Sequence, residues 1–125
     1  MIFTDPSQFS DLHELIHDRW FNVEHVLLDP ETRSVVIHIE PSGRALRWGG
    51  SARGAIFTVR NVEDLMINNT EKVRDYDINE VTYDEATRTL VLAGCIPIEI
   101  VFRVTRLELV VEELHPQTGP GLAPR

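Results

Sequence analysis

Hydrophobic positions recur at helical spacing near the start of the chain, in residues 5–18. Asp5 and Gln8 stand where a capping box would begin a helix, and Pro6 suits its first turn. The apolar side chains of this segment then fall on one helical face, namely Phe9, Leu12, Leu15 and Ile16. The pattern therefore predicts an amphipathic helix over residues 5–18 that packs on another element.

From residue 20 the period changes to two, which is typical of β-strands with one buried face. We expect strands at 20–28 and 34–40, joined by a turn, and further strands at 45–48, 55–60, 62–68, 76–83, 89–93, 98–104 and 107–113. Residues 115–125 contain three prolines and two glycines, and we expect this tail to lie outside the core. Residues 1–114 then form a single domain.

An internal repeat organises the predicted strands. Residues 23–37 align with residues 78–92, and both segments contain a D-x-x-T-R turn between two strands. A weaker similarity follows, in which Phe57 aligns with Phe102. Such turns are also common between unrelated strands. The favoured interpretation is a tandem pair of β units, at about 20–68 and 76–113.

Two tandem units predict the fold class. We expect a mainly β fold with one N-terminal helix (α+β), in which eight or nine mostly antiparallel strands form a sandwich or a half-open barrel. The helix would cover one open face or end, since exposed sheet edges need protection.

The chain of 125 residues is acidic, with 20 Asp+Glu against 12 Lys+Arg and a net charge of -8. This balance disfavours general nucleic-acid binding and suits a basic protein partner. No apolar run approaches the roughly 20 residues of a membrane span, and no signal-peptide pattern is visible. The single cysteine, Cys95, cannot form an internal disulfide, so we expect a buried free thiol and a reducing cytoplasm.

The string H-E-L-I-H at residues 13–17 resembles the zinc-binding helix of zincin peptidases over five residues. On a helix, His13 and His17 would face one Zn²⁺, and Glu14 would act as the general base. The zincin continuation is missing, and His25 or His38 could supply a third ligand only through the fold. We therefore interpret the two histidines as structural and expect no cofactor. A zinc-dependent hydrolase is the alternative.

A second resemblance covers the same region. Small bacterial β-rich domains that open with an LHD-type motif are similar to three segments of this chain, Leu15–Asp18, Val23–Ile39 and Ile56–Val62. Some of those domains are immunity proteins of polymorphic toxin systems. This chain departs from the pattern at two places. Ile16 stands where the motif has leucine, and the Trp20–Phe21 pair also differs from it. The resemblance implies a non-enzymatic interaction module and carries over no catalytic residue.

The end of the predicted helix also has a structural interpretation that is independent of any family. His17 and Asp18 are expected to form hydrogen bonds that fix the corner between the helix and the first strand.

Residues 43–54 form a basic, glycine-rich stretch in an otherwise acidic chain. Arginines pair with anions, glycines let backbone N–H groups approach closely, and tryptophan offers a stacking face. The candidate ligand-binding residues are therefore Arg44, Arg47, Trp48 and Arg53. The competing interpretation is a solvated hairpin loop.

The sequence as a whole favours a non-enzymatic, immunity-like interaction module of a bacterial cytoplasm that binds a basic protein. The alternatives are the zinc-dependent hydrolase and an anion or small-ligand binder that uses residues 43–54. No membrane association is expected, and the sequence leaves the oligomeric state open.

Overall fold

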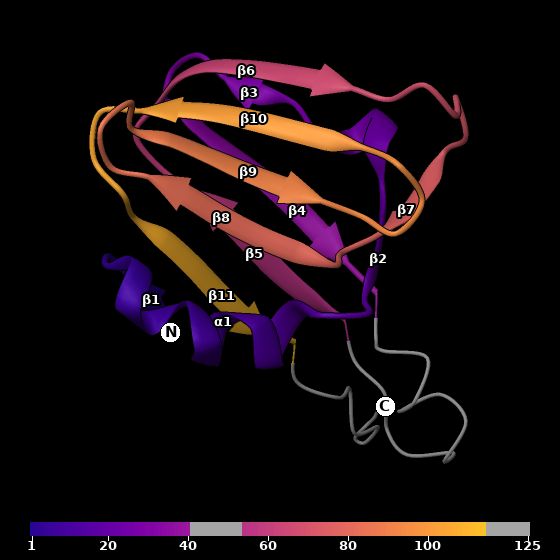
Figure 1. Cartoon of the computed structure of the whole chain (residues 1–125), viewed down its shortest axis with the longest axis horizontal. Coiled ribbons are helices and arrows are strands. Elements are labelled where there is room, and N and C mark those ends of the chain that lie inside the picture. The colour runs from indigo at the N-terminus through magenta and orange to yellow at the C-terminus, as the bar shows by residue number, and fades with distance from the viewer. Residues whose placement is uncertain (41–53, 115–125) are drawn as a thin grey trace, which may run out of the picture.

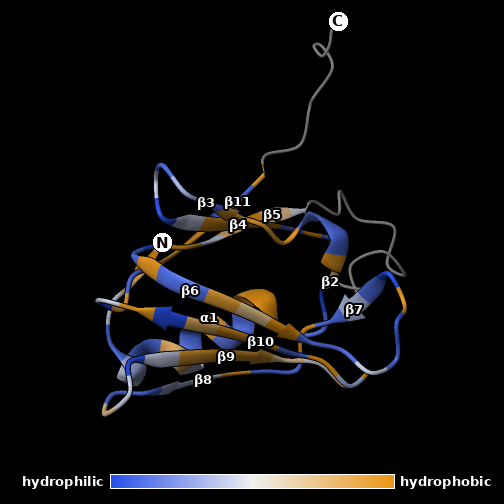
Figure 2. Cartoon of the chain, turned by 90° about the horizontal axis from the view of Figure 1, so that it is seen from above, coloured by the Kyte–Doolittle hydropathy of each residue, from blue (hydrophilic) through white to orange (hydrophobic). Residues whose placement is uncertain are grey.

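Alternation of buried and exposed side chains builds two antiparallel β-sheets that pack face to face (Figure 1). The computed structural model describes residues 1–40 and 54–114. The predicted fold class, mainly β with one N-terminal helix, is confirmed. The sheets form separate layers (Figure 2), so the chain adopts the sandwich rather than the half-open barrel. The predicted strand at 45–48 and the tail 115–125 lie outside the described residues.

The seven-stranded sheet has the order β1-β11-β5-β4-β2-β7, with β3 paired to β4. Its strands are β1 (Ile2–Phe3), β2 (Trp20–Asn22), β3 (Leu28–Asp29), β4 (Ser34–Ile39), β5 (Ala55–Val59), β7 (Asp75–Asp77) and β11 (Leu109–Glu113). The four-stranded sheet has the order β6-β10-β9-β8. It consists of β6 (Val62–Asn68), β8 (Glu80–Asp84), β9 (Thr89–Ala93) and β10 (Glu99–Val104).

The inner faces of the sheets enclose one apolar core. Its largest buried side chains include Phe21, Phe57, Tyr76 and Phe102. The helix α1 (Phe9–Ile16) lies between the two layers at one end of the sandwich (Figure 2) and adds Leu12 and Ile16 to the core. The helix therefore closes this end, and removal of apolar surface from water is its main stabilisation.

The predicted helix start is confirmed in its chemistry. The Asp5 carboxylate accepts a hydrogen bond from the Ser7 N–H at 2.8 Å, and the Gln8 side chain accepts from the Asp5 N–H at 3.1 Å. This capping box opens a 3-10 turn, η1 (Pro6–Gln8), which leads into α1. The predicted helix end at Asp18 is wrong, because α1 ends at Ile16 and His17 is extended.

Hydrogen bonds to distant parts of the chain end the helix early. The Asp18 N–H donates to the Ile78 carbonyl at 2.9 Å, and the Ile78 N–H donates to the Arg19 carbonyl at 2.9 Å. Asp18 turns the chain with a φ of 65°, a left-handed conformation that aspartate tolerates. The corner is thus set by backbone partners about 60 residues away in sequence. The helical periodicity of residues 5–18 could not predict these partners.

Two of the long predicted strands are each broken in the structure. The strand expected at 20–28 is interrupted by a second 3-10 turn, η2 (Val23–His25), because the Asn22 side chain accepts from the Glu24 N–H at 2.9 Å. The strand expected at 76–83 is divided where the chain passes from β7 in one sheet to β8 in the other. These breaks help to raise the described strands to eleven, above the eight or nine expected.

The two D-x-x-T-R turns adopt the same conformation. Between β3 and β4, the Asp29 carboxylate accepts from the N–H two residues further on at 2.9 Å, and Arg33 has a φ of 55°. Between β8 and β9, the Asp84 carboxylate makes the same bond at 2.9 Å, and Arg88 has a φ of 53°. The aligned segments therefore form hairpins closed by the same side-chain bond.

Strands from the two aligned segments, 20–68 and 76–113, pair with each other in both sheets. Phe21 lies opposite Tyr76 in the β2–β7 pair, and Tyr76 follows Phe21 by the same 55 residues that separate Asp29 from Asp84. Further along, β6 of the first unit pairs with β10 of the second, while β11 of the second unit pairs with β5 of the first. Each sheet therefore contains strands from both units.

The weaker similarity, which aligned Phe57 with Phe102, is wrong by two residues. The repeat aligns Ile37 with Leu92. In the structure Phe57 lies opposite Ile37, and Ile100 lies opposite Leu92. The residue equivalent to Phe57 is therefore Ile100, two residues before Phe102. A shift of two residues leaves every side chain on the same face of its strand. The alternating pattern alone could not detect this error.

Glu108 links the two crossover turns. Arg60, after β5, donates to the Glu108 carboxylate at 2.6 Å, and Arg106, before β11, donates to it at 3.3 Å. Hydrogen bonding from Arg60 holds the pKa of Glu108 below its usual value. Because folding lowers this pKa, the ionised pair stabilises the fold above the unfolded-state pKa and is lost as the pH falls through the folded-state pKa.

We expect Glu108→Gln to reduce the acid sensitivity of the fold. For the wild type, the free energy of unfolding should fall as the pH drops from about 5 to about 3. The Glu108→Gln variant should be less stable at neutral pH and lose less on acidification. Urea unfolding at a series of pH values measures this, with Glu112→Gln as an exposed control. Parallel pH profiles for wild type and the Glu108→Gln variant would contradict the assignment.

Candidate functional site

The residues of the zincin-like string do not meet at one point. His13 is half-buried, and its Nε2 accepts a hydrogen bond from the Val81 N–H of β8 at 3.0 Å. His17 lies beyond the end of α1, with Nδ1 3.4 Å from the Asp18 carboxylate, and Glu14 is exposed. In residues 1–40 and 54–114, no group of three or more His, Cys, Asp or Glu side chains is arranged to hold a metal ion.

His13 instead attaches the helix to the edge strand of the four-stranded sheet. We expect His13→Ala to lower the free energy of unfolding by about 1–2 kcal/mol, since the partly buried Val81 N–H loses its acceptor. His17→Ala is the matched control and should change it by less than about 0.5 kcal/mol, because His17 is exposed. Urea unfolding measures both. Equal losses for the two variants would refute the special role of His13.

The helix–strand corner is held by backbone bonds of Asp18 and Arg19, described above. The side chains of His17 and Asp18 are both exposed. Arg19 continues this corner, and its guanidinium Nη2 donates to both Glu113 oxygens, at 2.9 and 3.1 Å. The candidate ligand-binding residues of the basic stretch, Arg44, Arg47, Trp48 and Arg53, lie outside the described residues.

A buried carboxylate that sequence reasoning missed lies at the end of β7. Asp77 is 7% exposed, and its carboxylate accepts from the Cys95 and Ile96 N–H groups at 3.1 Å each. The expectation that Cys95 is buried is wrong, because Cys95 is exposed. Hydrogen bonding between the Cys95 side chain and the Asp77 carboxylate is the main reason that the pKa of the thiol is raised, so the thiolate is disfavoured. Asp77 therefore holds the loop between β9 and β10.

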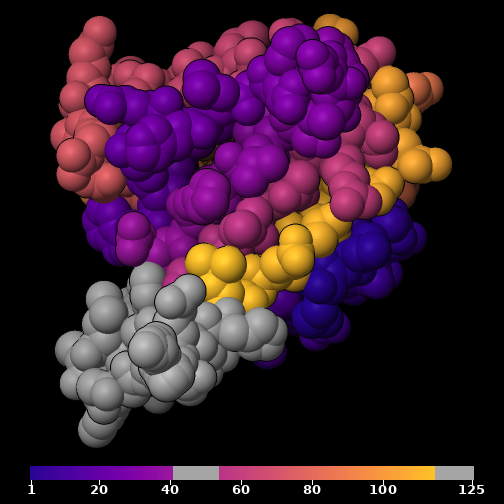
Figure 3. Space-filling view, turned by 180° about the vertical axis from the view of Figure 1, so that it is seen from behind, coloured from indigo at the N-terminus to yellow at the C-terminus, as the bar shows by residue number. Residues whose placement is uncertain are grey.

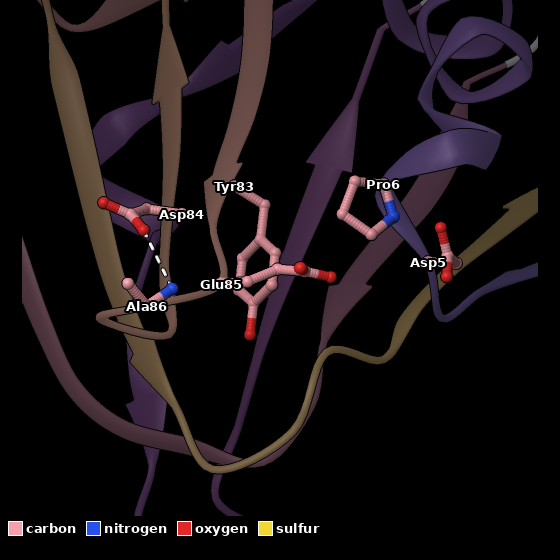
Figure 4. Close-up of a pocket in the computed structure, with 6 residues that line it drawn as sticks. All are labelled: Asp5, Pro6, Tyr83, Asp84, Glu85 and Ala86. Carbon is pink, nitrogen blue, oxygen red and sulfur yellow. Dashed lines mark hydrogen bonds between the residues drawn. The ribbon is translucent and has the colours of Figure 1, made fainter.

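A shallow hollow separates the start of the helix from the β8–β9 turn (Figure 4). It is lined by Asp5, Pro6, Tyr83, Asp84, Glu85 and Ala86. The carboxylates of Asp5 and Asp84 each accept a backbone N–H of their own turn, and hydrogen bonding from Ser7 lowers the pKa of Asp5. These two acids serve local structure, and they do not converge on a common point in the hollow.

The outer face of the four-stranded sheet carries a central apolar row. Met66 lies opposite Val101, Val101 opposite Val91, and Val91 opposite Thr82. Residues directly opposite each other share a face, and the intervening residues of these strands point into the core, as the burial of Leu90, Leu92, Ile100 and Phe102 shows. Met66 is 53% exposed and marks the open end of the row.

Acidic residues flank this apolar row on both sides. One neighbouring row contains Asp64, Arg103 and Asp84, and the other contains Glu99 and Glu80. All four acids are exposed, and none of them forms an ion pair with another described residue. We call this surface the acid-framed face, defined by Met66, Val91 and Val101 with Asp64, Glu80, Asp84 and Glu99.

The outer face of the seven-stranded sheet is on the side of the molecule seen in Figure 3, and its rows differ in composition. Its central row runs Ile2, Val110, Thr58 and Val36 across β1, β11, β5 and β4. The next row contains Glu112, Ile56 and His38. One acid in these seven positions leaves this face mainly apolar, so it lacks the charge of the acid-framed face.

The fold and this surface define a two-layer antiparallel β-sandwich with a helix at one end and one acidic sheet face. No protein-family model, curated protein or solved structure matched the chain. In the described part of the chain, no helix has the length and apolar character that crossing a membrane requires.

Proposed function

We propose that the chain is a non-enzymatic protein-interaction module whose partner presents a basic surface. The observation that supports this proposal most directly is the net charge of the described sandwich. It contains all 20 acidic residues but only eight of the 12 Lys+Arg, a net charge of -12. Four of these eight basic residues already form ion pairs with acids of this chain. A large surplus of unpaired carboxylates attracts a basic partner and speeds encounter with it.

The roles of the candidate catalytic groups support this proposal over the hydrolase alternative. His13 Nε2, one of the two ring nitrogens that can bind a metal, accepts a backbone N–H, and the buried carboxylate of Asp77 holds a loop. Groups engaged in this way contribute to rigidity, which suits a surface that recognises a partner with little rearrangement. An immunity-like role in a bacterial cytoplasm is the setting that we propose for such a module.

We also propose that the sandwich arose from two copies of one β unit. The matched hairpin turns and the exchange of β6 and β11 support this origin, because two identical units pairing around a twofold axis would produce the same strand exchange.

Reconstitution with a purified partner tests the proposed function. A protein that co-purifies with the full chain from its host should be basic, and the purified pair should bind at least about tenfold more weakly when salt rises from about 50 to about 200 mM. Chelators should leave the affinity unchanged. A purified partner whose binding is indifferent to salt, or hydrolysis that depends on Zn²⁺, would contradict the proposal.

A further inference from the structure

The acid-framed face is uncovered in the described part of the chain. In Figure 1 it is turned toward the viewer, with β6, β10, β9 and β8 in front and the seven-stranded sheet behind. The helix contacts the edge strand of this sheet, β8, where the Val81 N–H donates to His13. Its four strands therefore present their outward side chains directly to solvent.

The dimensions of the face follow from sheet geometry. The two acidic rows are four residues apart along the strands, roughly 13 Å, and the sheet is roughly 14 Å wide across four strands. Asp64 and Asp84 lie on opposite edge strands in one acidic row, while Glu99 and Glu80 lie on β10 and β8 in the other. The acids thus surround an apolar centre formed by Met66, Val91 and Val101.

Resting on the proposed function, we propose that the acid-framed face is where the basic partner docks. An apolar centre surrounded by charge matches the general anatomy of a protein interface, whose core is apolar and whose rim is polar. The partner that fits is a polypeptide surface with an exposed aliphatic ridge and Lys or Arg on both sides of it. Arg103, the one basic residue among these rows, lies next to Asp64 and leaves the face with a surplus of three negative charges.

Charge complementarity distinguishes this face from the other sheet. On the outer face of the seven-stranded sheet, the two rows described above contain a single acid, Glu112. The charge of that face therefore favours neither a basic nor an acidic partner. The acid-framed face selects against acidic and neutral partners, because carboxylates left without cations at an interface remain desolvated and unpaired.

A short peptide of repeated Lys-Ser-Val-Ser units is the probe for this proposal, because in an extended chain it presents Lys and Val in turn on one face. In ¹⁵N NMR titrations of the full chain, the largest shift changes should fall on residues of the acid-framed face. A variant with Asp64→Asn, Glu80→Gln, Asp84→Asn and Glu99→Gln should bind the peptide at least about tenfold more weakly. Met66→Ser should weaken binding a few-fold, since it removes the open end of the apolar row.

The matched control neutralises four exposed acids elsewhere, with Asp11→Asn, Glu24→Gln, Glu31→Gln and Glu112→Gln. It changes the net charge equally and should reduce affinity less than about threefold. Urea unfolding establishes that both variants remain folded.

Each other outcome has a defined meaning. Equal losses in the two quadruple variants would overturn the docking surface but leave the proposed function standing, since overall charge would then drive binding. Shifts concentrated in the Leu65 and Ile67 amides, unaffected by the substitutions, would also overturn it and indicate strand addition at the β6 edge. Absence of any binding would overturn both proposals.

Discussion

Gly94→Ala should destabilise the protein by about 3 kcal/mol or more, a large effect for the addition of one methyl group. A Cβ at this position would lie 2.4 Å from the Asp77 carbonyl oxygen and 3.0 Å from that of Ile96. Both neighbours are backbone atoms, which cannot rotate away as a flexible side chain can. The backbone of β7 or of the β9–β10 loop must shift to make room.

The same shift would weaken the bonds from the Cys95 and Ile96 N–H groups to the Asp77 carboxylate. Urea unfolding measures the loss, and Asn79→Ala is the control because Asn79 is exposed and lies close to Asp77 in sequence. Asn79→Ala should change the free energy of unfolding by less than about 0.5 kcal/mol. If Gly94→Ala were as stable as this control, the close approach of the β9–β10 loop to β7 would be disproved.

Tyr76→Ala should lower the free energy of unfolding by about 3–5 kcal/mol. Tyr76 is 0% exposed, its ring centroid lies 6.3 Å from that of Phe21, and its hydroxyl accepts from the Asn69 side chain at 3.1 Å. The substitution leaves a cavity beside Phe21, where β2 and β7 join the two units.

Tyr76→Phe separates packing from hydrogen bonding at the same position. This control keeps the ring and should lose only about 1 kcal/mol, the usual contribution of one hydrogen bond. Thermal and urea unfolding of the two variants provide the comparison. Similar losses for Tyr76→Ala and Tyr76→Phe would mean that the hydroxyl, not the ring, stabilises this junction.

Local chemistry predicted much of the fold. The capping box at Asp5, the strand at 62–68 and the strand at 89–93 all appear as the pattern indicated, because alternation and capping depend on neighbouring residues. The predictions failed where distant backbone groups decide. Asp18 leaves the helix to bond Ile78, and η2 interrupts a strand whose alternation was regular. Periodicity contains no information about such partners.

The candidate sites were less accessible to sequence reasoning than the fold. The H-E-x-x-H string left a metal site open as an alternative to structural histidines, but it did not indicate that the first histidine holds an edge strand and the second lies outside the helix. The acid-framed face combines residues from β6, β8, β9 and β10, and only the strand register brings them together. The net charge of -8 indicated a basic partner without indicating where it would bind.

The affinity of the full chain for two peptides of equal length, one of repeated Lys-Ser-Val-Ser units and the other of repeated Glu-Ser-Val-Ser units, tests the central claim most directly. Calorimetry at low salt should show binding of the Lys-Ser-Val-Ser peptide, weakening by at least about tenfold as salt rises from about 50 to about 200 mM. The Glu-Ser-Val-Ser peptide should not bind measurably. Equal binding of the two peptides, or binding of the Lys-Ser-Val-Ser peptide that salt does not weaken, would contradict an acidic module that recognises a basic partner.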